Sequence, residues 1–291
     1  MVLVRGCRVA AAAATLLLAA AACSSPPDAP PSCAAADAVL DVAYDPGGGH
    51  DGLTTLDIYP LTCDATSVLV WVHGGGWQVG DKANRLDDKR RLAVEQGWTL
   101  VSVNYRLVPE VRYPVPNEDT ANAVAWVVDH AVRYGADPSR VAVMGHSAGA
   151  GIVAAITTDE RYLAASGHAL SDVDCAVALD TEGYDVAARG EESAVYEAMF
   201  GSDPSQWADQ SPITHVSAGK GIPDYLIVTR GTTARVETAQ RFARALQDAS
   251  VPTTVIVARG LSHEDVNEAV GQPGDTVVTP PLVAFLSSCL A

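Results

Sequence analysis

Basic residues are scarce in this chain of 291 residues, which carries 19 Lys and Arg against 35 Asp and Glu and a formal net charge of −16. A nucleic-acid partner needs a basic face that pairs with phosphates, so the composition argues against DNA or RNA binding. The six cysteines show no C-x-x-C spacing, which argues against a zinc site. The sequence also lacks internal repeats and an interdomain linker, and its apolar fraction of 48% is enough for one large core.

Residues 1–22 have the features of a removable export signal. Arg5 and Arg8 precede an apolar run over residues 9–22, which is shorter than the ~20 residues that a membrane-spanning helix needs. The run ends in three alanines and Cys23, and the combination resembles a bacterial lipoprotein signal, in which the cysteine takes a diacylglyceryl group. Ordinary secretion after cleavage at an A-x-A site is the alternative. We expect an exported protein that is held at a membrane through Cys23 and a Pro- and Ser-rich tether over residues 23–37.

The predicted export makes disulfide bonds between the remaining cysteines more favourable. Cys33, Cys63, Cys175 and Cys289 are an even number in an oxidising compartment, which favours disulfides. The sequence leaves other pairings open, but we favour Cys33–Cys63 and Cys175–Cys289. The first would close a short loop around two N-terminal strands, and the second would join the start of an inner strand to the end of the last helix.

Short apolar runs alternate with helical patterns along the rest of the chain. Continuous apolar runs are typical of parallel strands that are buried on both faces. The runs cover residues 67–72, 99–104, 141–145, 175–179, 225–229 and 254–258, and residues 117–134 and 236–249 have helical periodicity. The pattern predicts an α/β fold with a doubly wound, mostly parallel sheet.

The two ends of this pattern depart from simple alternation. Residues 38–44 and 53–59 alternate apolar and polar side chains around a glycine-rich loop, which predicts an antiparallel hairpin at the start of the sheet. Residues 183–217 interrupt the alternation, and we expect them to form a short cap-like insertion. The predicted domain as a whole covers residues 38–291.

Two motifs directly follow predicted buried strands, where ligands bind in sheets of this kind. Residues 145–149 (GHSAG) fit the G-x-S-x-G pattern, in which a strained turn holds Ser147 above the sheet as a nucleophile. Residues 73–77 (HGGGW) lack the G-K-[ST] and G-x-G-x-x-G patterns of phosphate-binding loops. The backbone N–H groups of Gly75 and Gly76, together with that of Ala148, could instead surround an acyl oxyanion.

A serine hydroxyl needs a base before it can act as a nucleophile at neutral pH. Of the seven histidines, only His263 lies in a loop after the last predicted strand and follows the serine in the order expected of a general base. We expect His73 to brace the glycine loop by hydrogen bonds. We expect the side chain of His146 to point away from its neighbour Ser147.

These ordered motifs resemble α/β-hydrolases of the esterase and lipase group that contains hormone-sensitive-lipase-like and feruloyl-esterase-like enzymes. The resemblance rests on WVHGGGW, YPVPNEDTANAVAW, DPSRVAVMGHSAG, SPITHV and the late histidine, and covers the chain from about residue 39 to its end. It implies hydrolysis of small or medium acyl esters through an acyl-serine, with no metal or cofactor. Amidase or peptidase chemistry, or a surface lipoprotein that binds a ligand or partner without turnover, are the alternatives.

The residue that orients the histidine is the departure from this family. Its members usually place an Asp after the next-to-last strand, where this sequence has Ala234. Asp180 ends an apolar run one strand earlier, at the same predicted edge of the sheet, and is our preferred acid. Glu182 and Glu237 are alternatives, as is a Ser–His pair without an acid.

Overall fold

The computed structural model describes residues 33–45, 52–189 and 193–291. The predicted export signal, the anchoring Cys23 and most of the tether lie outside these residues, so they stay predictions. Within the described ranges, no helix has the length and apolar character that crossing a membrane requires.

The described residues contain one sheet of eight strands in the order β1-β2-β4-β3-β5-β6-β7-β8. The strands are β1 (Val39–Ala43), β2 (Thr55–Tyr59), β3 (Thr66–Val72), β4 (Trp98–Val103), β5 (Ala136–His146), β6 (Cys175–Leu179), β7 (Asp224–Thr229) and β8 (Thr253–Val257). The pair β1–β2 forms an antiparallel hairpin and β2 runs antiparallel to β4, whereas all later neighbours are parallel. The predicted fold class is therefore confirmed.

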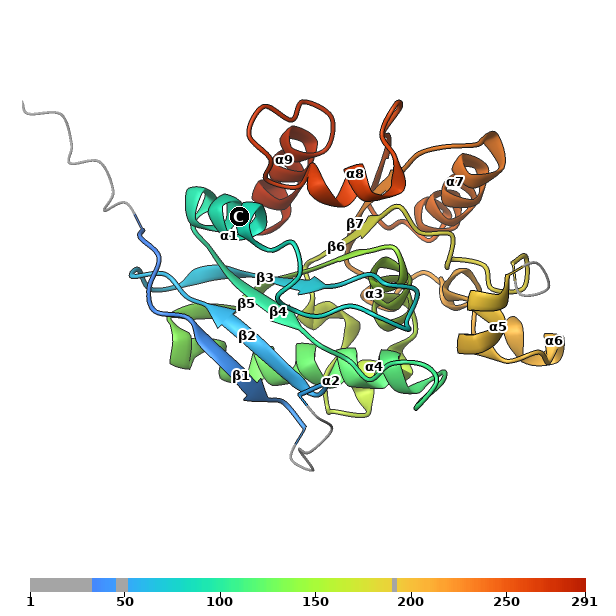
Figure 1. The fold of residues 1–291 in the computed structure, drawn as a ribbon, viewed down its shortest axis with the longest axis horizontal. Coiled ribbons are helices and arrows are strands. Elements are labelled where there is room, and N and C mark those ends of the chain that lie inside the picture. Colours follow the sequence, from blue (N-terminus) through green and yellow to red (C-terminus); the bar gives the residue numbers. More distant parts are fainter. Residues whose placement is uncertain (1–32, 46–51, 190–192) are drawn as a thin grey trace, which may run out of the picture. The chain divides into compact units, whose positions relative to one another are not determined.

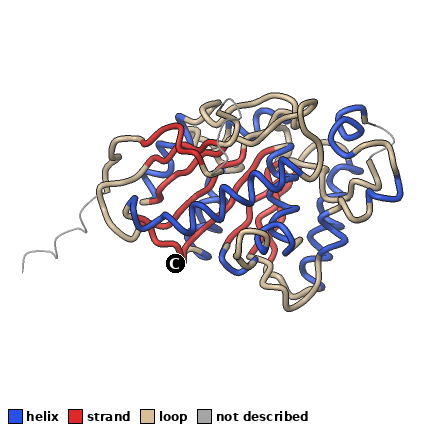
Figure 2. The backbone as a smooth tube through the Cα atoms, turned by 90° about the horizontal axis from the view of Figure 1, so that it is seen from below, coloured by secondary structure: helices blue, strands red, loops and turns tan. Residues whose placement is uncertain are grey.

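Helices cover both faces of the sheet (Figures 1 and 2). They are α1 (Asp87–Gln96), α2 (Val115–His130), α3 (Ala148–Thr158), α4 (Glu160–Ala164), α5 (Ala194–Phe200), α6 (Pro204–Trp207), α7 (Thr233–Asp248), α8 (His263–Glu268) and α9 (Thr279–Cys289). The predicted insertion over residues 183–217 contains α5 and α6. In Figure 1 these helices lie on the side of α3 that faces away from the β1–β2 hairpin.

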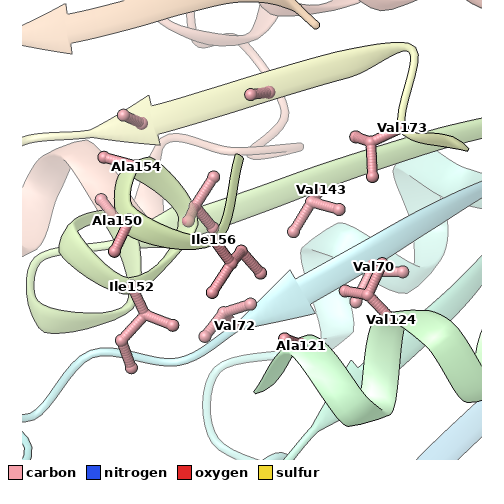
Figure 3. Packing of buried hydrophobic residues seen from close by; sticks show 14 of the residues in the cluster. Val70, Val72, Ala121, Val124, Val143, Ala150, Ile152, Ala154, Ile156 and Val173 are labelled. Atoms are coloured by element: carbon pink, nitrogen blue, oxygen red, sulfur yellow. The ribbon is translucent and has the colours of Figure 1, made fainter. Parts of the chain in front are cut away.

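The two faces of each central strand contribute to different parts of the core, because successive side chains of a strand point in opposite directions. Val70 and Val72 of β3 belong to a buried cluster that contains Ile156 of α3 (Figure 3). Leu69 and Trp71, which alternate with them along the strand, belong to a second cluster, on the side of α1 and α9. All seven residues of β3 are buried, which explains the continuous apolar run seen in the sequence.

Both disulfides of the favoured pairing are present in the structure. Cys33 is bonded to Cys63, with Cα atoms 5.4 Å apart, and the bond ties the residues before β1 to the loop after β2. Cys175 at the start of β6 is bonded to Cys289 at the end of α9, across 114 residues of sequence. Closing so long a loop reduces the freedom of the unfolded chain more than closing the shorter one.

Candidate active site

Ser147 lies on the sharp turn that joins β5 to α3. Its backbone angles are φ 56° and ψ −118°, a conformation that costs energy for any residue with a Cβ. The flanking glycines are needed because the turn is crowded. A Cβ on Gly145 would lie 2.5 Å from the carbonyl carbon of Gly149, and a Cβ on Gly149 would lie 2.3 Å from the carbonyl oxygen of Val72. The G-x-S-x-G pattern therefore has a steric cause.

The preferred nucleophile, base and acid lie in one chain of hydrogen bonds. Ser147 Oγ is 2.8 Å from His263 Nε2, and His263 Nδ1 is 2.6 Å from Asp180 Oδ2. The two alternative acids do not bond to this histidine: Glu182 accepts hydrogen bonds from two arginines, and Glu237 is exposed on α7. A carboxylate in the position of Asp180 holds the imidazole so that Nε2 can accept the serine proton.

Asp180 lies close to the position where the family usually has its acid, because β6 and β7 are neighbours in the sheet. The two strands run parallel with Leu179 opposite Val228, so the loops that follow them begin at the same edge of the sheet. The backbone N–H of Asp180 donates to the carbonyl of Val228 at 2.7 Å and so fixes the start of its loop. Ala234 lies in the first turn of α7, and His263 has a carboxylate partner in Asp180 although position 234 carries none.

Two arginines from the neighbouring loop and helix enclose the Asp180 carboxylate. Arg235 Nε donates to Oδ1 at 2.8 Å and Arg230 Nε donates to Oδ2 at 2.6 Å, while Arg235 Nη2 donates to the Asp180 backbone carbonyl. Burial alone would raise the pKa of Asp180. The hydrogen bonds from His263 and the two arginines outweigh that effect and lower the pKa to about 2. Asp180 is therefore ionised throughout the neutral and mildly acidic range.

This shift predicts how acid affects the stability of the fold. A carboxyl whose pKa falls from 3.8 to about 2 on folding stabilises the protein above pH ~4, and the stabilisation is lost as the pH drops towards 2. We expect the wild-type free energy of unfolding to exceed that of Asp180→Asn at pH 5, and the excess to shrink by about 2 kcal/mol by pH 2.5. Urea titrations of both proteins at several pH values measure this. An excess that is the same at pH 5 and pH 2.5 contradicts the assignment.

The glycine loop after β3 touches the nucleophile turn. A Cβ on Gly74 would lie 3.1 Å from the Cβ of Ser147, so the two segments are in direct contact. Gly75 and Gly76 have φ values of 119° and 61°, and a Cβ on Gly75 would collide with the carbonyl oxygen of Val79 at 1.8 Å. Position 75 therefore requires glycine, and the loop backbone turns here beside Ser147.

Three backbone donors are free in this region. Among the described residues, the N–H groups of Gly75 and Gly76 have no acceptor. Ala148 is the first residue of α3, so its N–H has no partner within the helix. Because Gly76, Ser147 and Ala148 border the same cavity, these donors are placed to bind a negatively charged oxygen atom beside Ser147.

His73 holds the glycine loop as the sequence indicated. Its Nδ1 lies 2.7 Å from the carbonyl of Gly74, and its ring stacks on Tyr105 with ring centroids 4.4 Å apart. The Tyr105 hydroxyl donates to the backbone carbonyl of His73 at 2.9 Å. Burial lowers the pKa of His73, so the ring is neutral at neutral pH. The ring packs between the glycine loop and Tyr105.

His146 has a contact with the base that the sequence did not reveal. Its side chain packs against His263 with ring centroids 4.5 Å apart, and its Nε2 lies 2.9 Å from the backbone carbonyl of His263. Burial and the neighbouring imidazole lower the pKa of His146 to about 3, so the neutral ring donates from Nε2 to that carbonyl. The only sequence signal was its place directly before Ser147, where we expected the side chain to point elsewhere.

A cavity of about 240 Å³ opens at this constellation. Its lining contains Ser147 and His263, together with the apolar side chains of Trp77 and of the α5 residues Val195 and Tyr196. The predicted insertion thus borders the site through α5. Over the described ranges, no three His, Cys, Asp or Glu side chains are grouped so that they could hold a metal ion.

The sequence pattern of the alpha/beta hydrolase fold family matches residues 69–266. Carboxylesterase NlhH of Mycobacterium tuberculosis is 42% identical over 110 residues, which are 36% of this chain and 34% of that protein. Esterase LipI of the same species is 40% identical over 126 residues, 42% of this chain and 39% of that protein. The chain therefore spans little more than a third of the length of these relatives.

Solved structures resemble the whole fold. A truncated carbohydrate esterase from gut microbiota superimposes with a TM-score of 0.72, covering 88% of this chain and 97% of that one at 20% identity. Carboxyl esterase 2 from the fungus Tuber melanosporum gives a TM-score of 0.69 at 22% identity, covering 89% of this chain and 88% of that one. At these identities the likeness concerns the fold alone.

Proposed function

The chain belongs to the alpha/beta hydrolase fold family, and from that premise we propose that it is a serine carboxylesterase acting on small and medium acyl esters. The observation that carries the proposal is the hydrogen-bonded chain from Asp180 through His263 to Ser147, facing free backbone donors across one cavity. The esterase names of the curated relatives that match over part of the chain support it.

The proposed reaction has two stages. In the first, Ser147 Oγ attacks the ester carbonyl carbon while His263 Nε2 accepts its proton, and the N–H groups of Gly75, Gly76 and Ala148 bind the oxyanion. His263 then gives that proton to the leaving alcohol as the carbon–oxygen bond breaks, and an acyl-serine remains. In the second stage, a water loses a proton to His263 and attacks the acyl carbon, and the proton returns to Ser147 Oγ as the carboxylic acid leaves.

The size of the cavity supports the choice of small and medium acyl groups. Its volume of about 240 Å³ lies below the range of ~300–1,000 Å³ that is usual for sites of drug-sized ligands. Trp77 forms one wall and packs edge-on against Tyr196 of α5, with ring centroids 5.4 Å apart. A cavity of this volume with two aromatic rings in its wall favours short and medium acyl groups over long ones.

The alternative of a hydrolase-fold protein that binds without turnover was motivated by the missing acid. Asp180, which follows β6, is hydrogen-bonded to His263. An acid is therefore present beside the histidine, and its absence is no longer a reason to favour binding without turnover. Amidases and peptidases use the same constellation, and they differ in the bond that is cleaved. Matched esters and anilides of acetic and butyric acid separate these activities by comparison of kcat/KM.

Covalent labelling of Ser147 tests the proposal. We expect the folded protein to react with an alkyl fluorophosphonate to one adduct per chain, found by mass spectrometry on the peptide that carries Ser147. We expect His263→Ala to label far more slowly, since without the base the hydroxyl is a weak nucleophile. Folded wild-type protein that stays unlabelled, and that cleaves p-nitrophenyl acetate and butyrate no faster than buffer, contradicts the proposed function.

A further inference from the structure

Arginine side chains gather near Ser147 in a chain that is strongly acidic overall. Among the described side chains, Arg189, Arg230 and Arg235 form ion pairs with Asp180 and Glu182, so three cations meet two anions. Both acidic partners and two of the arginines, Arg230 and Arg235, border the same cavity as Ser147. Arg189 does not border the cavity, so the cluster holds three described cations and two anions, whereas its part in the cavity wall holds two of each.

The arginines that border the cavity differ in how far their donors are used. Each nitrogen of the Arg235 guanidinium donates a hydrogen bond: Nε to Asp180 Oδ1, Nη2 to the Asp180 backbone carbonyl and Nη1 to Glu182. Arg230 donates only from Nε, to Asp180 Oδ2. Its two terminal nitrogens have no partner among the described residues, and its side chain remains 22% exposed. A guanidinium presents five N–H donors, so Arg230 offers most of its hydrogen-bonding capacity to whatever enters the cavity.

Asp180 does not need this second arginine for charge balance. His263 and Arg235 already donate to its two carboxylate oxygens, so Arg230 adds a positive charge to a carboxylate that is satisfied without it. The unused N–H donors of Arg230, in a cluster of three arginines and two carboxylates, therefore point to an anion that is supplied by the ligand.

We propose that Arg230 binds a carboxylate on the substrate, so that the preferred substrates are esters that carry a negative charge. This rests on the proposed esterase function and names the substrate class. The consecutive contacts from Ser147 through His263 and Asp180 to Arg230 place the guanidinium within about 10 Å of the serine oxygen. A monoester of a short dicarboxylic acid, or the acylated form of a hydroxy acid, spans that distance. The planar guanidinium can bind such a carboxylate through two parallel hydrogen bonds.

Two pairs of esters that differ only in charge test the proposal. The first is 3-acetoxybenzoate against 3-acetoxybenzamide, and the second is monomethyl glutarate against the methyl ester of glutaramic acid. Hydrolysis is followed in a pH-stat at low ionic strength, and each kcat/KM is divided by the rate constant of alkaline hydrolysis of the same ester. We expect the wild type to favour the charged ester by about tenfold or more in at least one pair. We expect Arg230→Met to abolish this preference and Arg230→Lys to keep part of it.

The ratio of kcat/KM for the charged ester to kcat/KM for the neutral ester, taken within each variant, separates carboxylate binding by Arg230 from its effect on the position of Asp180. Arg230 also donates to Asp180, so Arg230→Met is expected to slow both members of a pair, and that common loss cancels in the ratio. Arg241→Met is the matched control, because it removes the same charge from α7, where Arg241 pairs with Asp185 at 3.8 Å outside the cavity wall. We expect its ratio to equal that of the wild type.

Two results overturn the proposal: a wild type that shows no preference for the charged ester in either pair, or an Arg230→Met variant that keeps the preference. The first needs no variant and so does not depend on whether a substitution folds. Failure of the esterase function would look different, since the neutral esters would then be cleaved no faster than in buffer.

Discussion

Replacing Ser147 by alanine is expected to lower kcat for p-nitrophenyl acetate by about 10⁴- to 10⁶-fold. The substitution removes the atom that forms the acyl intermediate, and His263 then has no bound hydroxyl to deprotonate. The fold should remain, because alanine differs from serine only by the oxygen and meets the same backbone strain at φ 56°. Steady-state kinetics of freshly purified protein measure the effect, and thermal unfolding monitored by circular dichroism checks the fold.

The double substitution gives this prediction a sharper control. Serine and histidine act as one unit, so His263→Ala alone should be nearly as damaging as Ser147→Ala, and the double variant should be no slower than either single one. The remaining activity would come from the N–H donors of Gly75, Gly76 and Ala148. A Ser147→Ala rate within tenfold of the wild type would show that turnover does not pass through this serine.

Ser147 and His263 could be predicted as site residues from the sequence alone. Ser147 lies in a motif that directly follows a predicted strand. His263 follows the last predicted strand, and the structure places it at the first residue of α8 and not in a loop. Both lie on the side of the sheet where the carboxyl ends of the parallel strands meet. The crowding between Gly145, Gly149 and β3 explains why the motif keeps its small residues. Local signals of this kind are visible in a single sequence because the cause and the residue lie within a few positions of each other.

The acid was harder to predict because its identity depends on which strands are neighbours. Asp180 follows β6 and reaches His263 only because β6 pairs with β7 in parallel register, and pairing order is not written in any short segment. The sequence could therefore rank Asp180 above Glu182 and Glu237, but without excluding them. The structure favours Asp180, since His263 contacts this carboxylate and neither glutamate.

The two arginines that contact Asp180 could not be identified as its partners from the sequence. Arg230 and Arg235 flank the loop where the family usually has its Asp, in the stretch TRGTTAR. Their partner lies 50 and 55 residues earlier, and long-range ion pairs have no periodicity that would reveal them. The contact between His146 and His263 spans 117 residues and was missed for the same reason.

Replacing Asp180 by asparagine is expected to lower kcat by about 10⁴-fold at neutral pH while leaving the shape of the site unchanged. An asparagine cannot hold the imidazole in the tautomer that leaves Nε2 free to accept a proton, and it cannot stabilise the imidazolium that forms. It also leaves Arg230 and Arg235 without their anion at a site where Asp180 is fully buried. We therefore expect a loss of stability of about 3 kcal/mol as well.

Kinetics must be measured well below the lowered unfolding temperature, so that lost catalysis is not confused with lost fold. Glu237→Gln is the matched control at the other candidate position, because that side chain is exposed on α7 and its substitution should change neither activity nor stability. Glu182→Gln should have a small effect, since it loosens only one contact of Arg235. If Asp180→Asn kept wild-type kcat, the acid would be dispensable and the Ser–His pair would work alone. If Glu237→Gln lost activity instead, α7 would have to approach His263 during turnover, which its exposed position here does not favour.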